Sequence, residues 1–352
     1  MIRKLLDYYR QFEELSPEEI SHELRERREA ERASALTEVH PLDLRSSAWH
    51  EPPHAEAVNA ATYALRRALN AYPDDTQLRE ALAARHGIDA EQVAPGHGAG
   101  ELLHAAFRAI GGGRVAIAWP GWSPLPGLVH EAGGTPLPVT SGELAGVEPD
   151  TRAVVVCSPN DPTGETFGLT ALATRLAEPV WLVVDQALAE LAPDEDAAAL
   201  LAARERILIV RSFSKAHGMA GLRAGYALAN DAELLDRLSP AGGVSSPAQA
   251  AMLWAAREGD PVVRRRRAAA ARERERLAEA LRGTPFSFPA GHGHLVWLSS
   301  TEEDGAALAR RLAAQRVYVA PGSGWGDEQH VRIALRDAAA TDRLLAVLEL
   351  GP

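Results

Sequence analysis

The chain contains a single cysteine, Cys157, so it cannot form an internal disulfide framework. A lone cysteine is typical of a protein that works in a reducing compartment. The surrounding sequence VVVCSP is apolar on one side, which predicts that this thiol is buried and structural.

Long apolar runs are also missing. No stretch approaches the roughly 20 apolar residues that a membrane-spanning helix needs, so we expect no membrane partner. The first residues, MIRKLLDYYRQFEEL, mix charged and apolar side chains and do not form the continuous apolar core of a signal peptide. We therefore expect a cytoplasmic protein.

Basic residues are fewer than acidic ones. The net charge is −11, and the 37 basic and 48 acidic residues are interspersed, which argues against nucleic acid as a partner. The basic cluster at residues 264–267 opens an Ala- and Arg-rich run whose alternating charges predict a solvated helix face. The histidines are too scattered to indicate a metal site.

The length of 352 residues, 46% of them hydrophobic, allows a sizeable core and two lobes. We expect residues 1–54 to form a helical arm and loop that belong partly to the small lobe and contact a second subunit. Residues 55–235 are expected to form a large domain, and residues 236–352 a small C-terminal domain.

Residues 1–38 predict two helices, with Ser16 as the cap of the second, Pro17 at its first position and Glu19 completing a capping box. The apolar side chains of the first helix need a surface to cover them. In a symmetric dimer that surface could belong to the neighbouring subunit. These side chains are Tyr8, Tyr9, Phe12 and Leu15.

The middle of the chain alternates short apolar runs with helical segments. The runs are GRVAIAWPGW, GGTPLPV, AVVVCSPN, VWLVVDQA and RILIVRSFS. This alternation predicts an α/β fold with a mostly parallel sheet between helices. After about residue 236 the pattern changes to a long helical region and short strands, which predicts a smaller α+β domain.

The segment RSFSKAHGMAGLRAGY, residues 211–226, combines one lysine, Lys215, with Ser212, Ser214 and Arg223. A lysine amine condenses with a carbonyl once its site makes the neutral amine accessible. Hydroxyls and a guanidinium bind phosphate oxygens, and the two glycines let the backbone approach closely. The grouping therefore suits a cofactor that carries both an aldehyde and a phosphate.

Four polar or aromatic residues follow apolar runs, at the strand ends where ligands bind in parallel sheets: Trp122, Asn160, Asp185 and Lys215. A separate phosphate cradle is indicated where glycines at residues 96, 98 and 100 precede a predicted helix. A dinucleotide fingerprint fails there, because its third glycine would have to replace Glu101.

Taken together, these motifs resemble the fold-type I pyridoxal-phosphate enzymes. Within them they resemble the class I/II aminotransferases and the histidinol-phosphate-aminotransferase-like branch. The resemblance runs from about Tyr72 to Arg332, and its most specific motif is SFSKAHGMAGLRAGY, which is similar to the family's Schiff-base segment. The other matching motifs are SPNDPTG, the isolated Asp185, GHGAGE and AYP.

The resemblance implies that pyridoxal 5'-phosphate is the cofactor and that Lys215 forms an aldimine with it. Lys215 would then act as general base and acid at the substrate carbon. Asp185 would pair with the ring nitrogen and keep it protonated. Asn160 would donate a hydrogen bond to the phenolic oxygen, and Trp122 would stack on the ring.

The resemblance also implies a phosphate site and a homodimer with shared active sites, because Tyr72 matches a tyrosine that reaches the phosphate in the neighbouring subunit. Arg332 matches the arginine that clamps the substrate carboxylate. We expect His50, His217 and His294 to approach the substrate. The phosphate ligands would be Ala99 and Gly100 through their backbone, together with Ser212, Ser214 and Arg223.

The sequence departs from the family pattern at several positions. In DQALAE, Leu188 occupies the place of a tyrosine that hydrogen-bonds the cofactor. The loop SSAWHEPP, residues 46–53, and His294 also differ from the histidinol-phosphate branch. These differences argue against histidinol phosphate as the substrate and suggest a specialised amino donor.

Three functions remain compatible with the sequence. The first is transamination between an amino acid or related amine and a 2-oxo acid or other carbonyl compound. The second is decarboxylation, replacement, cyclisation or oxidation on the same scaffold, which the missing tyrosine keeps open. The third, a cofactor-binding module of a transcription regulator, is disfavoured because only about 54 residues precede the first match and both Lys215 and Asp185 are present.

Overall fold

The computed structural model describes residues 22, 25–26, 40–148, 150–193 and 197–348. The chain divides into two units, Met1–Leu42 and Asp43–Pro352, and the boundary falls within strand β1 (Leu42–Asp43). The two helices expected in residues 1–38, including the apolar side chains of the first, lie almost wholly outside the described residues. Their role in a dimer stays a prediction.

The larger sheet of the second unit has seven strands in the order β2-β8-β7-β6-β5-β3-β4. Strands β3 to β7 run parallel, while β8 is antiparallel to both of its neighbours. The expected mostly parallel sheet is therefore confirmed. The strands are β2 (Val93–Gly96), β3 (Arg114–Ala118), β4 (Thr135–Val139), β5 (Thr151–Cys157), β6 (Trp181–Asp185), β7 (Ile207–Ser212) and β8 (Gly225–Ala229).

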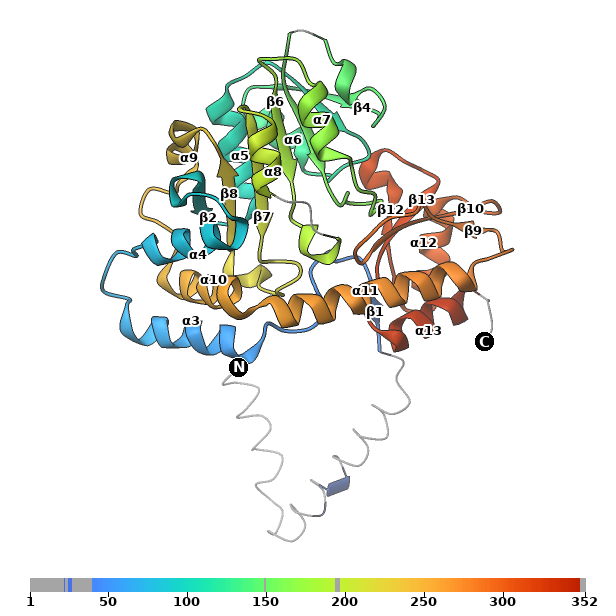
Figure 1. The fold of residues 1–352 in the computed structure, drawn as a ribbon. Coiled ribbons are helices and arrows are strands. Elements are labelled where there is room, and N and C mark those ends of the chain that lie inside the picture. The colour runs from blue at the N-terminus through green and yellow to red at the C-terminus, as the bar shows by residue number, and fades with distance from the viewer. Residues whose placement is uncertain (1–21, 23–24, 27–39, 149, 194–196, 349–352) are drawn as a thin grey trace, which may run out of the picture. The chain divides into compact units, whose positions relative to one another are not determined.

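Helices cover both faces of this sheet (Figure 1). Because successive strand side chains point to opposite faces, Val154 and Val156 pack with α4, α7, α8 and α10, whereas Ala153 and Val155 pack with α5, α6 and α9. This two-sided burial explains why the strands are apolar throughout. The helices are α3 (Ala55–Arg67), α4 (Thr76–His86), α5 (Ala99–Ile110), α6 (Leu125–Glu131), α7 (Leu169–Arg175), α8 (Ala197–Ala203), α9 (Ala232–Leu238) and α10 (Ser246–Glu258).

A second, antiparallel sheet has the strand order β12-β13-β10-β9. Together with its helices it forms the expected smaller α+β part. The two sheets lie in residues 93–229 and 286–334, on either side of the domain boundary expected near residue 235. The domain boundaries themselves stay a prediction. The elements are β9 (Phe286–Ser287), β10 (Leu295–Ser300), β11 (Val317–Tyr318), β12 (Ala320–Pro321), β13 (His330–Ala334), α11 (Asp260–Ala280), α12 (Gly305–Ala314) and α13 (Ala338–Val347).

Short 3₁₀ helices connect several of these elements. They are η1 (Ala90–Gln92), η2 (Leu144–Gly146), η3 (Ala189–Leu191), η4 (Ala220–Leu222) and η5 (Gly322–Trp325). Within the described ranges, we find no helix long and apolar enough to cross a membrane.

Helix α11 differs from the solvated helix that its charges predict. Arg264 and Arg265 are exposed, but Arg266 is 2% exposed and donates to the carbonyl oxygens of Ala216 and Pro52 at 2.9 and 2.6 Å. Helical periodicity puts Arg266 on the same face as the buried Val263 and Ala270. This face of the basic run therefore packs inside the protein.

Arg204, directly after α8, ties the turn before β6 to the end of α7. Its side chain is 2% exposed, and its two terminal nitrogens donate to four backbone carbonyls, those of Ala173, Leu176, Ala177 and Val180. Buried carbonyls need hydrogen-bond donors, and the guanidinium supplies one to each of these four. Arg204 thereby anchors the connection that leads into β6.

We expect Arg204→Met to lower the free energy of unfolding by about 3 kcal/mol or more, because several buried carbonyls lose their donor. The matched control is Arg206→Met, since Arg206 is half-buried and donates to the single carbonyl of Pro179. Its loss should stay within about 1 kcal/mol. Urea titration followed by circular dichroism measures both values, and an equal loss in the two variants would contradict the anchoring role of Arg204.

Candidate active site

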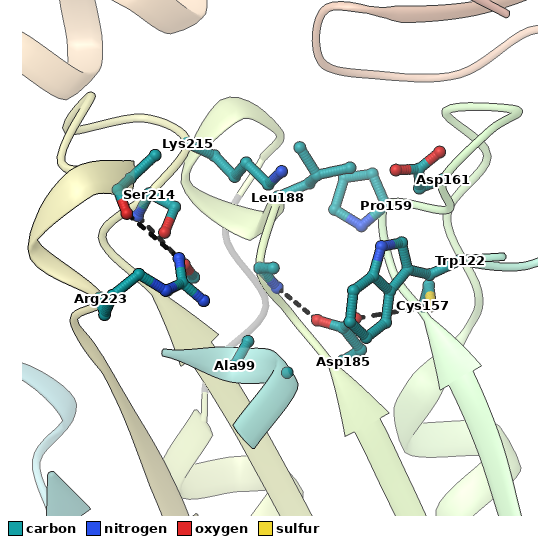
Figure 2. Close-up of a pocket in the computed structure, with 14 residues that line it drawn as sticks. Ala99, Trp122, Cys157, Pro159, Asp161, Asp185, Leu188, Ser214, Lys215 and Arg223 are labelled. Carbon is teal, nitrogen blue, oxygen red and sulfur yellow. Dashed lines mark hydrogen bonds between the residues drawn. The ribbon is translucent and has the colours of Figure 1, made fainter. Parts of the chain in front are cut away.

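A pocket of about 190 Å³ opens at the carboxyl ends of β5, β6 and β7 (Figure 2). Both polar and apolar side chains form its wall. The lining residues are Ala99, Gly100, Trp122, Cys157, Pro159, Asp161, Asp185, Ala187, Leu188, Ser212, Ser214, Lys215, Ala220 and Arg223.

The parallel register explains why residues far apart in sequence meet here. Cys157 ends β5 and lies opposite Asp185, which ends β6, while Ser212 ends the next strand, β7. Parallel strands present their carboxyl ends at one edge of a sheet. Asp185 and Lys215, which were expected at or just after strand ends, both line this pocket.

Asp185 is a buried carboxylate on this wall, 6% exposed. Its Oδ1 accepts a hydrogen bond from the Ala187 amide at 2.9 Å, and its Oδ2 lies 3.7 Å from Sγ of Cys157. Burial raises the pKa of Asp185 to about 6, although the Ala187 amide and the Lys215 charge oppose this rise. Cys157 is buried as predicted, and burial beside this carboxylate raises the pKa of its thiol.

Lys215 extends into the pocket from the loop after β7 (Figure 2). Its Nζ donates to Oγ of Ser47 at 2.6 Å. Burial lowers the pKa of Lys215, while the carboxylates of Asp161 and Asp185 oppose that shift. A lysine in this setting gains access to its neutral, nucleophilic form.

The opposite end of the pocket is suited to an anion. Ala99 and Gly100 form the first turn of α5, where backbone amides are free to bind a ligand and the helix dipole is positive. Gly98, with φ of +91°, comes so close to Arg223 that a Cβ there would lie 3.1 Å from Nη2. The Ser214 amide donates to Oγ of Ser212 at 3.0 Å, so both serines are held beside Arg223.

Trp122 forms part of the pocket wall near the start of α5. A Cβ on Gly100 would lie 3.1 Å from its indole ring, so only glycine lets the ring and the helix start approach this closely. The apolar face of the pocket is completed by Leu188, which is 5% exposed and packs with Trp49.

Asp161 lines the pocket, whereas Asn160, the residue expected to reach the cofactor, does not. Nδ2 of Asn160 instead donates to the Pro120 carbonyl at 2.8 Å and to Oγ1 of Thr163 at 3.0 Å. A turn begins at Asp161, and the two side chains point in different directions, that of Asn160 into the loop and that of Asp161 to the pocket. Asp161 therefore takes the position that the sequence motif assigned to Asn160.

Arg332, on β13, reaches the same region from the smaller sheet. Its Nη1 donates to Oδ1 of Asp161 at 2.7 Å, and its Nη2 donates to the Arg45 carbonyl at 2.5 Å. The guanidinium lies 5.0 Å from the ring centroid of Trp325. The arginine expected to bind a carboxylate is thus next to the pocket and already paired with a carboxylate of this chain.

Residues 45–52, here called the roof segment, pass over Lys215. Ser47 accepts from Lys215, and its own carbonyl lies 3.0 Å from Nε2 of His294. Burial lowers the pKa of His294 to about 3, so the neutral ring donates to this carbonyl through Nε2. His50 is mostly buried within the segment and lies 4.0 Å from Asp337, so His50 and His294 support the roof segment.

One expected site residue, His217, lies outside the pocket wall. It is 3% exposed, and its Nε2 lies 2.9 Å from the carboxylate of Glu190. Tyr72 is 92% exposed within this chain, and its expected role depends on a second subunit.

Sequence reasoning missed Ser47 and Asp161 as pocket residues. Asp161 could have been considered from the sequence, because it lies inside the motif SPNDPTG directly after Asn160. Ser47 belongs to the loop at residues 46–53, which differs from the histidinol-phosphate branch. Its partner Lys215 lies 168 residues away in the sequence. No local pattern indicates such a contact.

The family model of the class I and II aminotransferases matches residues 42–348. The chain belongs to this family. An aromatic amino acid aminotransferase of Corynebacterium efficiens is 31% identical over 331 residues, which cover 88% of this chain and 92% of the relative. A histidinol-phosphate aminotransferase of Rubrobacter xylanophilus is 32% identical over 317 residues, which cover 84% and 88%.

The fold of this aminotransferase is that of a solved relative. A double mutant of the Thermus thermophilus aspartate aminotransferase matches with a TM-score of 0.78 and 25% identity, covering 96% of this chain and 98% of that one. The expected fold-type I architecture and the aminotransferase activity are therefore confirmed. Class I and II aminotransferases depend on pyridoxal 5'-phosphate.

The pocket of this aminotransferase fits that cofactor. The start of α5 and Arg223 form an anion site at one end, Asp185 is a buried carboxylate able to pair with a ring nitrogen, and Lys215 is the amine within reach of the pocket. Because residue 98 is glycine, no side chain there crowds the Arg223 guanidinium at the anion end. The donor set therefore agrees with a phosphate, an aromatic nitrogen and an aldehyde.

In the cofactor-free protein, Asp185→Asn should stabilise the fold near neutral pH. The pKa of Asp185 rises from 3.8 to about 6 on folding, so ionising this carboxyl costs stability as the pH rises between these values. Two pKa units correspond to about 3 kcal/mol. Urea titrations should show the variant more stable by up to about this amount at pH 7.5, with no difference near pH 3.8.

Glu190→Gln serves as the control of opposite sign. Burial would raise the pKa of Glu190, but His217 and Arg85 together lower it from 4.5 to about 2. Its contribution is therefore present above pH 4.5 and is lost as the pH falls towards 2, so this variant should be less stable than wild type at pH 7.5. Equal effects of the two variants at pH 7.5 would contradict the assigned pKa directions.

Proposed function

We propose that the pocket around Lys215 is where this aminotransferase moves an amino group between an amine and a carbonyl compound. One observation carries the proposal: Lys215 lines the pocket, and burial lowers the pKa of its amine. Bound pyridoxal phosphate would supply an aldehyde that exchanges between amines and a ring that accepts electrons.

Lys215 has two tasks in this proposal. Its neutral amine would hold the cofactor, and its Nζ, when an incoming amine has taken that place, would take up and return the proton at the substrate carbon. Ser47, 2.6 Å from Nζ, orients the amine and gives it a hydrogen-bonding partner. Asp161 and Asp185 supply the negative charge that balances the protonated form.

The remaining pocket residues hold the cofactor. Asp185 would pair with the ring nitrogen, and Trp122 would lie against the ring face. The phosphate would be bound by the backbone of Ala99 and Gly100 and by Ser212, Ser214 and Arg223. The role foreseen for Asn160 is left out of this proposal, because its amide is engaged by Pro120 and Thr163.

We take aromatic amines and aromatic amino acids as the first donors to test. Two observations support this choice: a relative is named an aromatic amino acid aminotransferase, and Leu188 and Trp49 make one side of the site apolar. Formation of pyridoxamine phosphate from a donor distinguishes transamination from decarboxylation or replacement, which Leu188 leaves open. A cytoplasmic location stays a prediction.

Lys215→Ala should abolish covalent attachment of the cofactor and lower the transfer rate at least 10²–10⁴-fold, the range typical of lost acid–base catalysis. Borohydride reduction followed by peptide mass spectrometry should find the cofactor on Lys215 in the wild-type protein. Lys4 is the only other lysine in the sequence, so Lys4→Arg is a matched control that should keep attachment and activity. A cofactor adduct that persists in Lys215→Ala would overturn the assignment.

We also propose that the protein is a homodimer in which Tyr72 completes the partner's site. The exposed large hydrophobic side chains of the described residues all lie between residues 58 and 72: Val58, Tyr63, Leu65, Leu69 and Tyr72. Helix α3 packs on α10, which leaves its other face uncovered within this unit (Figure 1). An apolar patch of this kind favours a protein partner, and a second copy accounts for the exposure of Tyr72.

Leu69→Glu should weaken the dimer at least tenfold, because it buries a charge in the proposed interface. Analytical ultracentrifugation over a concentration series measures this change. Thr170→Glu, which adds the same charge at an exposed position of α7, is the control and should leave the association unchanged. A wild-type protein that sediments as a monomer of 37.7 kDa at all concentrations would contradict the proposal.

A further inference from the structure

Asp161 and Arg332 form a buried ion pair beside the pocket. Oδ1 of Asp161 accepts from Nη1 of Arg332 at 2.7 Å, and the two side chains are 8% and 12% exposed. Asp161 also lines the pocket and supplies the largest electrostatic contribution that raises the pKa of Lys215. The negative charge at Asp161 is thus shared between a guanidinium on one side and the reacting amine on the other.

The other groups around Arg332 fix its guanidinium in this pairing. Nη2 donates to the Arg45 carbonyl, and the planar group lies over the ring of Trp325. The Trp325 ring is itself held by a hydrogen bond from its Nε1 to the Gly121 carbonyl at 2.8 Å. Nε of Arg332 is buried and finds no hydrogen-bonding partner among the described residues. The guanidinium is therefore oriented, and part of its donor capacity is used by Asp161.

A carboxylate ligand competes with Asp161 for this guanidinium. Arginine binds a carboxylate most strongly through two parallel N–H donors. Here one of the two terminal nitrogens already donates to Asp161 and the other to Arg45. A ligand carboxylate at Arg332 would also lie next to the carboxylate of Asp161 that pairs with Arg332 in a buried site, where two carboxylates repel strongly. Displacing Asp161 would leave its carboxylate buried without its partner.

We propose that Asp161 is a specificity-determining residue that competes with substrate carboxylates for Arg332 and so favours substrates without a carboxylate beside the reacting carbon. This inference rests on the proposed function of the Lys215 pocket. An amine without that carboxylate leaves the Asp161–Arg332 pair intact on binding. An α-amino acid or 2-oxo acid has to disturb it.

A different role for Asp161 makes the opposite prediction. If Asp161 only oriented Arg332 for a substrate carboxylate, its removal would weaken the binding of carboxylates. If Asp161 competes, its removal strengthens their binding. The sign of one affinity change therefore separates the two roles.

The test uses two unreactive ligands that differ in charge, 3-phenylpropionate and its neutral amide, 3-phenylpropionamide. Neither carries an amine or a carbonyl that can be transaminated, so isothermal titration of the holoenzyme measures binding alone. We expect Asp161→Asn, which keeps the side-chain shape and removes the charge, to bind 3-phenylpropionate at least tenfold more tightly than wild type. Binding of the amide should change less than twofold, which also shows that the site is still folded.

Three further variants sharpen the comparison. Asp161→Ser removes the same charge through a different side chain and should act in the same direction. Glu165→Gln removes a charge from an exposed residue four positions along the loop and should leave both affinities unchanged. In an Arg332→Ala background, Asp161→Asn should no longer increase the affinity for the carboxylate, because the contested guanidinium is gone.

The outcomes distinguish the role of Asp161 from the proposed function of the Lys215 pocket. Unchanged or weaker binding of 3-phenylpropionate by both Asp161 variants would overturn the role of Asp161, while the cofactor on Lys215 and amino transfer in the wild-type protein would still support the proposed function. A wild-type protein that fails to attach pyridoxal phosphate at Lys215 would overturn the proposed function itself.

Discussion

A lysine amine and two carboxylates share one buried pocket, and the rest of the site depends on how their charges are balanced. Removing water from Lys215 favours its neutral form, whereas Asp161 and Asp185 favour the protonated form. Asp185 is itself poorly suited to ionisation, because it is buried at a strand end and burial raises its pKa. A bound ligand that carries both a basic nitrogen and a phosphate would relieve these costs. The pocket therefore lowers the stability of the fold, and binding of such a ligand would recover part of this loss.

The two sheets contribute different parts of this balance. The larger sheet supplies the strand-end groups, and its parallel register brings Cys157, Asp185 and Ser212 to one edge. The smaller sheet supplies Arg332, whose pairing with Asp161 connects the two parts across the pocket. The larger sheet thus supplies residues for the reaction, such as Asp185. The smaller sheet supplies Arg332, on which substrate selectivity would depend.

The sequence predicted the features that follow from local periodicity. Apolar runs indicated the strands, so the strand-end position of Asp185 and the loop position of Lys215 could be foreseen. The choice between Asn160 and Asp161 could not be made, because it depends on which way a proline-rich turn faces. His217 was expected near the pocket from its distance to Lys215, but its pairing with Glu190 is set by tertiary packing. Arg266 likewise looked solvated until its carbonyl partners, distant in sequence, were known.

The roof segment and Leu44, the residue directly before it, are bonded to both the smaller and the larger part of the protein. The Leu44 amide donates to the Tyr318 carbonyl, the Leu44 carbonyl accepts from Ala334, and the Ser47 carbonyl is held by His294, all from the smaller part. Three residues after Leu44, Ser47 bonds Nζ of Lys215, which belongs to the larger part. A shift of one part relative to the other would therefore move Ser47. This movement would change the position of Nζ of Lys215, to which Ser47 is hydrogen-bonded. The orientation of that amine is consequently a property of the whole 43–348 region, and a substitution far from the pocket that shifts the smaller sheet would act at Nζ without touching it.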